Sequence, residues 1–183
     1  MHRTRRALLA SLLVVAAVSL GFALSAVPNV ELLTFVVFLS GFLLGVRYGA
    51  VVGALSATLF SMLNPLGAGL PPLVIAQALG QTVVGVVGAL GGPLVARTAS
   101  RPLACVLATG MGLVITVAFD AVTTAGAYVT FVEEKSIGGL VKFGVGGLLF
   151  VGVHIVWNTA LFAVALAPTV RVLWRFREEL TAG

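Results

Sequence analysis

The chain has 183 residues, of which 60% are hydrophobic and 9% are charged. This composition is too apolar for a soluble domain and the length too short for two membrane domains, so it predicts one integral membrane domain over residues 1–183. The net charge of +5 does not indicate nucleic-acid binding, because the basic residues are spread over separate junctions rather than gathered along one stripe.

Six apolar segments follow one another along the chain and predict an all-α membrane protein, built as a bundle of six transmembrane helices. The segments cover residues 7–25, 31–46, 48–64, 72–96, 103–131 and 138–170. A bilayer core about 30 Å thick needs about 20 apolar residues per helix, and four of the segments reach or approach that length. The second and third are shorter, and we expect them to form a tight helical hairpin.

The first segment also has features of a secretory signal. A basic stretch at residues 3–6 precedes an apolar core that ends at Ala23-Leu24-Ser25, a sequence similar to a cleavage site. The apolar run from Ala7 to Val27 is longer than a usual signal core. We therefore expect a retained first helix, with cleavage as the alternative.

Positive charge is distributed unequally between the two ends of the predicted bundle. With a cytoplasmic N-terminus, nine of the eleven basic residues lie inside: Arg3, Arg5, Arg6, Arg47, Arg97, Arg101, Arg171, Arg175 and Arg177. Only Lys135 and Lys142 then lie at outer ends. The positive-inside rule therefore predicts cytoplasmic N- and C-termini, with the 64–71 and 132–137 loops outside.

Two further patterns concern packing. The stretch from Asn64 to Pro72 is too apolar for a fully solvated loop, and we expect it to form a lid over the outer side. Glycines recur at a spacing of four in Gly41/Gly45, Gly49/Gly53 and Gly88/Gly92. Small residues at this spacing let helices approach closely in lipid, so they predict tight packing within the bundle rather than a special dimer motif.

The most polar residues inside the apolar segments lie in the last three, at a spacing of four. The sets are Gln77 and Gln81, then Asp120, Thr124 and Tyr128, then His154 and Asn158 with Trp157 between them. This spacing places each set on one helix face, and lipid drives polar faces inward. We therefore predict a substrate-binding cavity open to the outer side and lined by Gln77, Gln81, Asp120, Thr124, Tyr128, His154, Trp157 and Asn158.

Asp120 is the one carboxylate in the interior of an apolar segment, since Glu31 falls at the outer end of the second segment, and Asp120 needs partners there. The donors available are His154, Asn158 and the two glutamines. These groups could bind a ligand, or they could form an interhelical hydrogen-bond network that only fixes the packing. Both alternatives stay open for Asp120 and His154.

The sequence does not indicate an enzyme. Asp120 and His154 could form a base and its orienting group, but no activated serine is placed beside them and Cys105 lies deeper. A zinc site needs three or four ligands, and His154 is the only histidine within the segments. No nucleotide-binding motif occurs either, so we expect no catalytic residue, no metal and no cofactor, and energy must come from partners.

Four stretches carry a resemblance to a known family. They are residues 27–34 (VPNVELLT), 41–49 (GFLLGVRYG), 119–124 (FDAVTT) and 154–160 (HIVWNTA). With six short-looped segments, these make the chain similar to the S component, the membrane substrate-binding subunit, of energy-coupling factor (ECF) vitamin transporters. The resemblance implies a protein of the bacterial or archaeal inner membrane that captures a vitamin or related micronutrient outside. It would deliver this substrate with a coupling membrane subunit and two cytoplasmic ATPases.

The resemblance also implies a docking face on the first helix, built from small residues spaced by four. Ala7/Ser11 and Ala17/Gly21 match this spacing, with serine and glycine replacing one alanine of each pair. The substrate stays open among a flavin, a thiamin-like cation, a modified purine and a corrinoid. A scaffold similar to the rod-shape-determining membrane proteins, which bind partners rather than solutes, is the alternative. An outer face that is open or filled with apolar side chains would favour the scaffold.

Overall fold

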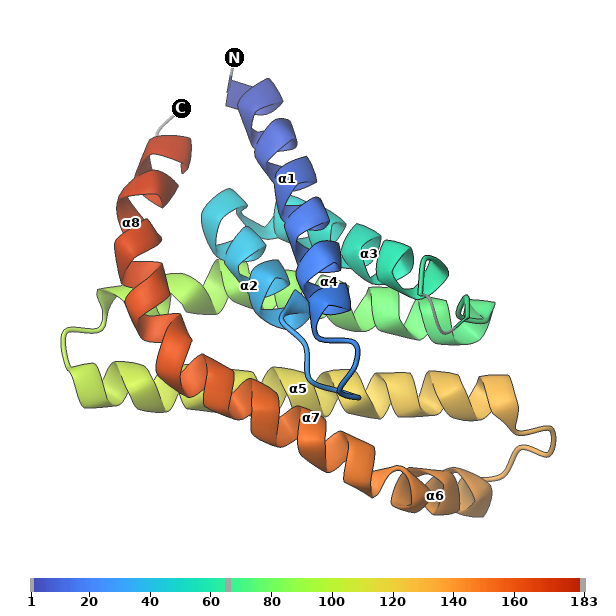
Figure 1. Cartoon of the computed structure of the whole chain (residues 1–183). Helices are drawn as coiled ribbons and strands as arrows, with labels where there is room; N and C mark the ends of the chain where they lie inside the picture. Colours follow the sequence, from blue (N-terminus) through green and yellow to red (C-terminus); the bar gives the residue numbers. More distant parts are fainter. Residues whose placement is uncertain (1, 65–66, 182–183) are drawn as a thin grey trace.

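The computed structural model describes residues 2–64 and 67–181, and in these ranges every regular element is helical (Figure 1). In chain order the elements are α1 (His2–Ala23), α2 (Leu33–Leu44), α3 (Val46–Met62), α4 (Pro71–Arg97), α5 (Arg101–Phe131), α6 (Ile137–Gly146), α7 (Leu148–Leu161), the π-helical turn η1 (Phe162–Leu166) and α8 (Ala167–Thr181). The predicted all-helical class is therefore confirmed.

Local chemistry explains several helix boundaries. Prolines occupy the first positions of α4 and α5, where a missing N–H costs nothing because no intrahelical partner exists for it. Ser100 caps α5 by accepting a hydrogen bond from the Leu103 N–H at 3.4 Å. The single residue Gly45, with a φ of 86°, separates α2 from α3 and makes the predicted hairpin tight.

Four helices are long and apolar enough to cross a membrane, which indicates a membrane protein. They are Arg3–Ala23, Pro71–Arg97, Arg101–Phe131 and Leu148–Glu179. The others are shorter, and α2 with its 12 residues is about 18 Å long, less than the bilayer core. Six complete crossings therefore stay a prediction.

The last predicted segment, 138–170, differs from the structure. The helix breaks at Gly147, so that α6 is separate, whereas α7, η1 and α8 continue one another as far as Thr181. Gly144, Gly146 and Gly147 weaken the helix at this point, because glycine loses more backbone entropy than other residues on helix formation. α6 has no buried residue and packs loosely beside α5 and α7 (Figure 1).

Glycine lets α2, α3 and α4 touch backbone to backbone. A Cβ atom on Gly41 or Gly49 would overlap the Gly85 carbonyl group, and one on Gly85 would overlap that of Gly49. Gly53 meets the backbone of Gln81, and Gly88 meets that of Phe38. The prediction of tight packing within the bundle is confirmed at these positions.

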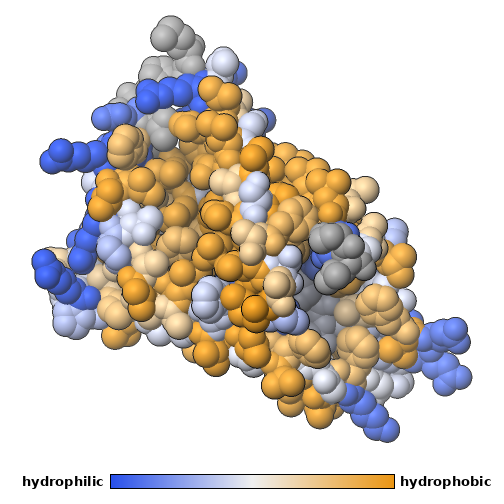
Figure 2. Space-filling view, viewed as in Figure 1, coloured by the Kyte–Doolittle hydropathy of each residue, from blue (hydrophilic) through white to orange (hydrophobic). Residues whose placement is uncertain are grey.

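The two ends of the molecule are polar and the middle is apolar. Figure 2 shows hydrophilic residues at the upper left and the lower right, with a hydrophobic band between them. Both termini lie on the same side of the molecule in Figure 1. At that end the guanidinium groups of Arg97 and Arg177 lie 4.9 and 5.0 Å from the ring centre of Trp174. The Arg97 contact joins α4 to α8, whereas Arg177 and Trp174 both belong to α8.

α1 exposes only one of the two small-residue pairs predicted to dock a partner. Ala7 and Ser11 are exposed, whereas Ala17 is 0% exposed and Gly21 is buried against the ring of Phe60. Ala17 and Gly21 serve packing inside the protein, because α2 and α3 already cover that face of α1. Of the two predicted pairs, only Ala7 and Ser11 are accessible to a partner, and docking itself stays a prediction.

Candidate functional site

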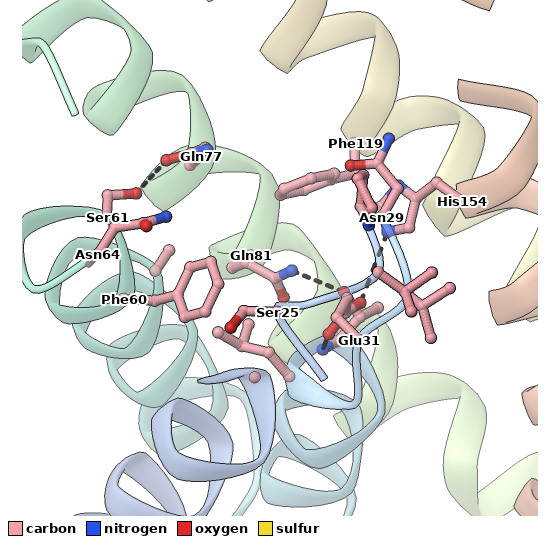
Figure 3. A pocket seen from close by; sticks show the side chains of 17 residues that line it. Ser25, Asn29, Glu31, Phe60, Ser61, Asn64, Gln77, Gln81, Phe119 and His154 are labelled. Carbon is pink, nitrogen blue, oxygen red and sulfur yellow. Dashed lines mark hydrogen bonds and ion pairs between the residues drawn. The ribbon is translucent and has the colours of Figure 1, made fainter. Parts of the chain in front are cut away.

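A cavity of about 340 Å³ lies between the C-terminal end of α1, the 24–32 loop and helices α2, α3, α4, α5 and α7 (Figure 3). Its polar lining includes side chains of Ser25, Asn29, Glu31, Ser61, Gln77, Gln81 and His154. A cavity with this many polar groups inside an otherwise apolar bundle marks a candidate binding site, because intramembrane polar groups are costly to bury.

His154 of α7 lies between two carboxylates. Its Nδ1 atom is 2.6 Å from Oδ1 of Asp120 on α5, and its Nε2 atom is 3.5 Å from Oε1 of Glu31 in the 24–32 loop. His154 and Asp120 are 5% and 7% exposed, so water screens their interaction little. A doubly protonated ring would donate to both carboxylates, whereas a neutral ring has one N–H only.

Glu31 is held in place by two helices. Its Oε2 atom accepts the Thr34 backbone N–H at 2.8 Å, one of the unpaired donors at the start of α2. Its Oε1 atom accepts a hydrogen bond from Nδ2 of Asn158 at 3.3 Å. The carboxylate therefore links the start of α2 to α7 while lining the cavity.

The 24–32 loop is also fixed to α7 through its backbone and Asn29. The indole Nε1 of Trp157 donates to the carbonyl oxygen of Glu31 at 2.7 Å, and Nδ2 of Asn29 donates to that of Phe150 at 2.7 Å. Asn29 adopts a φ of 60°, a left-handed conformation that asparagine tolerates better than most residues. The loop wall of the cavity therefore has a defined position.

α4 contributes two amides to the opposite wall. Nε2 of Gln81 donates to the Thr34 hydroxyl at 2.7 Å, and Gln77 is hydrogen-bonded to Ser61 of α3. The Oε1 atom of Gln81 is buried and accepts no hydrogen bond in the described residues. A buried acceptor without a donor is costly, so a ligand or an ordered water is expected to serve it.

Two phenylalanine rings complete the lining, and Figure 3 shows Gln81 between them. Phe60 of α3 stacks on Phe22 with ring centres 4.8 Å apart, and Phe119 of α5 meets the His154 ring edge to face at 5.7 Å. Each ring is thus held by a second ring, which suits it to contact a planar ligand.

Of the eight predicted site residues, the structure brings three to the cavity wall, namely Gln77, Gln81 and His154. Asp120 and Asn158 lie behind the wall, where they hold His154 and Glu31. Trp157 anchors the loop instead and borders a separate shallow apolar groove on the surface. Gln77 and Gln81 of α4 and His154 of α7 therefore face the cavity, and their role in binding a substrate stays a prediction.

Thr124 and Tyr128 do not line the cavity, which corrects the prediction for α5. The Tyr128 hydroxyl accepts from the Ser136 N–H at 2.8 Å, and it lies 3.0 Å from the Ser136 carbonyl oxygen and 3.2 Å from that of Glu134. Thr124 lies next to Gly144 of α6. Both residues share a helix face with Asp120, but they lie further along α5, where that face meets α6 and the turn before it.

The main residue that the sequence analysis missed is Glu31. This acidic residue starts the second apolar segment and so falls at the outer end of the predicted bundle, whereas its side chain is only 17% exposed. Its carboxylate accepts the Thr34 N–H three residues on, the kind of contact by which a side chain caps the start of a helix. No comparable sequence pattern marked four other lining residues, Asn29, Phe60, Ser61 and Phe119.

The segment that covers the cavity differs from the predicted lid at residues 64–72. Asn64 is the member of the 64–72 stretch that lines the cavity, and residues 65–66 lie outside the described residues. The 24–32 loop contributes Val27, Pro28, Asn29, Val30 and Glu31. The segment that covers the site in the described part of the chain is therefore mainly the loop between α1 and α2.

Two serine hydroxyls at the cavity wall are engaged by partners other than His154. The hydroxyl of Ser25 donates to the Phe22 carbonyl oxygen and that of Ser61 pairs with Gln77, so neither is hydrogen-bonded to His154. Across the described ranges, no group of three or more histidine, cysteine or acidic side chains is arranged to hold a metal ion. The His154 nitrogen atoms face the two carboxylates.

Comparison of the chain with protein-family models, curated protein sequences and solved structures gave no match. The functional conclusion therefore depends on the cavity and on the sequence patterns described above.

Proposed function

We propose that the chain is the substrate-binding membrane subunit of an ECF-type importer, an S component with six membrane crossings. It would capture a vitamin or related micronutrient from the outer side of a bacterial or archaeal inner membrane, with both termini in the cytoplasm. The observation that carries this proposal is the buried Glu31–His154–Asp120 array at the wall of a polar and aromatic cavity. Ionisable groups within a membrane-spanning bundle are rare and most often mark a functional site.

The volume of the cavity narrows the range of candidate substrates. About 340 Å³ is near the lower end of the range for small-molecule pockets. This volume favours a flavin, a thiamin-like cation or a modified purine over a much larger corrinoid.

The scaffold alternative is less well supported. A scaffold similar to the rod-shape-determining proteins needs no polar cavity, and an outer face filled with apolar side chains would favour it. Here the described lining contains a carboxylate, an imidazole and four side-chain amides instead.

Energy would come from partners, since the sequence contains no nucleotide-binding motif. The proposed partners are a coupling membrane subunit and two cytoplasmic ATPases, with Ala7 and Ser11 of α1 as the exposed candidates for docking.

Purification from native membranes tests the proposal. Mild detergent extraction of the tagged protein should recover a membrane subunit and ATPases, identified by mass spectrometry. The reconstituted complex should show ATP-dependent uptake of the bound vitamin, and the protein alone should show none. ATP hydrolysis by the chain alone, or purification without any ATPase, would contradict the assignment.

A further inference from the structure

We infer that the cavity selects a small planar cation that carries N–H donors, rather than a neutral or anionic solute. This inference rests on the proposed function, because it specifies the substrate class of the same site. Three features of the cavity support it: its charge, its unpaired acceptor and its aromatic walls.

The charge of the site is negative. Glu31 and Asp120 are two carboxylates, and His154 supplies at most one positive charge between them. The residues that line the cavity include no lysine or arginine. In a low-dielectric site an uncompensated negative charge favours a cation strongly, and an anion would meet repulsion with no cationic group to bind it.

Two acceptor atoms of the lining have hydrogen-bonding capacity left. Oε1 of Gln81 belongs to a side chain that is 3% exposed, lines the cavity and has no donor. Oε2 of Glu31 accepts the Thr34 N–H and has room for a second donor, because each carboxylate oxygen can accept two hydrogen bonds. A ligand with at least two N–H groups could satisfy both atoms.

The aromatic walls fit a planar cation as well. The faces of phenylalanine rings attract cations, and Phe60 and Phe119 contribute to the lining on either side of Gln81 (Figure 3). A flat ligand could therefore contact the rings while its N–H groups point to Gln81 and Glu31.

Three small probes of the same shape separate charge from size. Benzamidine is a cation with N–H donors, benzamide is its neutral counterpart and benzoate is the anion. Each is titrated against the full-length protein in lipid nanodiscs, and binding is followed by saturation-transfer NMR. We expect benzamidine to bind at least about tenfold more tightly than benzamide, which is the scale for a charge-assisted hydrogen bond, and benzoate not to bind.

Variants locate the effect. Glu31→Gln should remove most of the preference for benzamidine, whereas Glu133→Gln, a change at an exposed acidic residue in the turn before α6, should leave it intact. Gln81→Met removes the acceptor and keeps the length of the side chain, so it should weaken benzamidine binding about twofold to tenfold. This second variant tests the site even if Glu31→Gln does not fold.

Benzamide binding as tightly as benzamidine, binding of benzoate, or no binding by any of the three would overturn the inference. The proposed function has a separate readout. A neutral or anionic vitamin found in a complex with the ATPases would leave import standing and remove only the charge preference. Selective binding of benzamidine by a protein that has no ATPase partner would support the charge preference and contradict the import function.

Discussion

The Nδ1 atom of His154 lies 2.6 Å from Oδ1 of Asp120, across 34 positions of sequence. The contact joins α7 to α5 between two buried side chains. It satisfies a carboxylate that would otherwise be costly in an apolar bundle. Asp120 does not touch the cavity, because it is not part of the lining, and it holds His154 from behind the wall.

The first prediction concerns this pair. Asp120→Asn should lower the free energy of unfolding by about 1–3 kcal/mol, since a charge-assisted hydrogen bond is lost in a buried place. The same change should alter ligand affinity less than Glu31→Gln does. Combining it with His154→Gln should cost less than the sum of the single changes, by about 1–3 kcal/mol, in a double-mutant cycle of chemical unfolding in detergent. Additive costs would show that the two residues are not coupled.

The second prediction concerns the loop between α1 and α2. Trp157→Phe removes the hydrogen bond from the indole to the Glu31 carbonyl oxygen and keeps most of the apolar ring. Hydrogen exchange at residues 24–32 should become faster, because a bond worth about 0.5–1.5 kcal/mol no longer holds the loop.

Trp174→Phe is the matched control for that loop. Trp174 also donates an indole hydrogen bond, to Glu178 at 2.6 Å, but it lies in α8 at the end of the protein that bears the termini. Its replacement should leave exchange in the 24–32 loop unchanged. Equal effects of the two variants would show that the Trp157 bond does not position the loop.

A third prediction tests the glycine contact between α3 and α4. Gly85→Ala should destabilise the protein by about 1–3 kcal/mol or more, the scale for overpacking, because the new Cβ would overlap the Gly49 carbonyl group. Gly110→Ala in α5 is the control, since nothing lies within 4 Å of a Cβ there. That change should be neutral or stabilise the helix by about 1 kcal/mol. Equal denaturation midpoints for both variants would refute the contact.

Sequence periodicity predicted which polar residues share a helix face, because helical geometry sets the spacing and lipid excludes polar faces. Gln77 and Gln81 share one face of α4, and His154 and Asn158 share one face of α7, because a spacing of four permits no other arrangement in a helix. The need of Asp120 for a partner followed from burial alone, and His154 was among the few donors available.

Other parts of the site depend on contacts that no local pattern encodes. Glu31 belongs to a loop whose path is fixed by Trp157 and Asn158, 126 and 127 positions away. Tyr128 lies on the predicted face of α5, yet that face extends beyond the cavity to the turn at Ser136. The helix break at Gly147 could not be predicted from the sequence, because it depends on how loosely α6 packs, and α6 has no buried residue.

The fourth prediction concerns orientation in the membrane. In a Cys105→Ala background, cysteines introduced at Ala68 and Lys135 should react with an impermeant thiol reagent in intact cells. A cysteine at Arg101 should react only after permeabilisation. All three positions are exposed, so reactivity reports on the side of the membrane rather than on burial. Labelling at Arg101 alone in intact cells would reverse the orientation expected from nine basic residues against two.

Small molecules that remain bound to the purified protein give the most direct test of the central claim, that this cavity holds a solute. Native mass spectrometry should find one small molecule per chain in the wild type. Ser25→Trp, which fills the cavity from its loop wall, should lose it. Ser19→Trp, on the exposed face of α1, should retain it. Equal occupancy of the wild type and Ser25→Trp, or a wild-type protein that binds no vitamin-sized molecule even when supplied with one, would contradict the account.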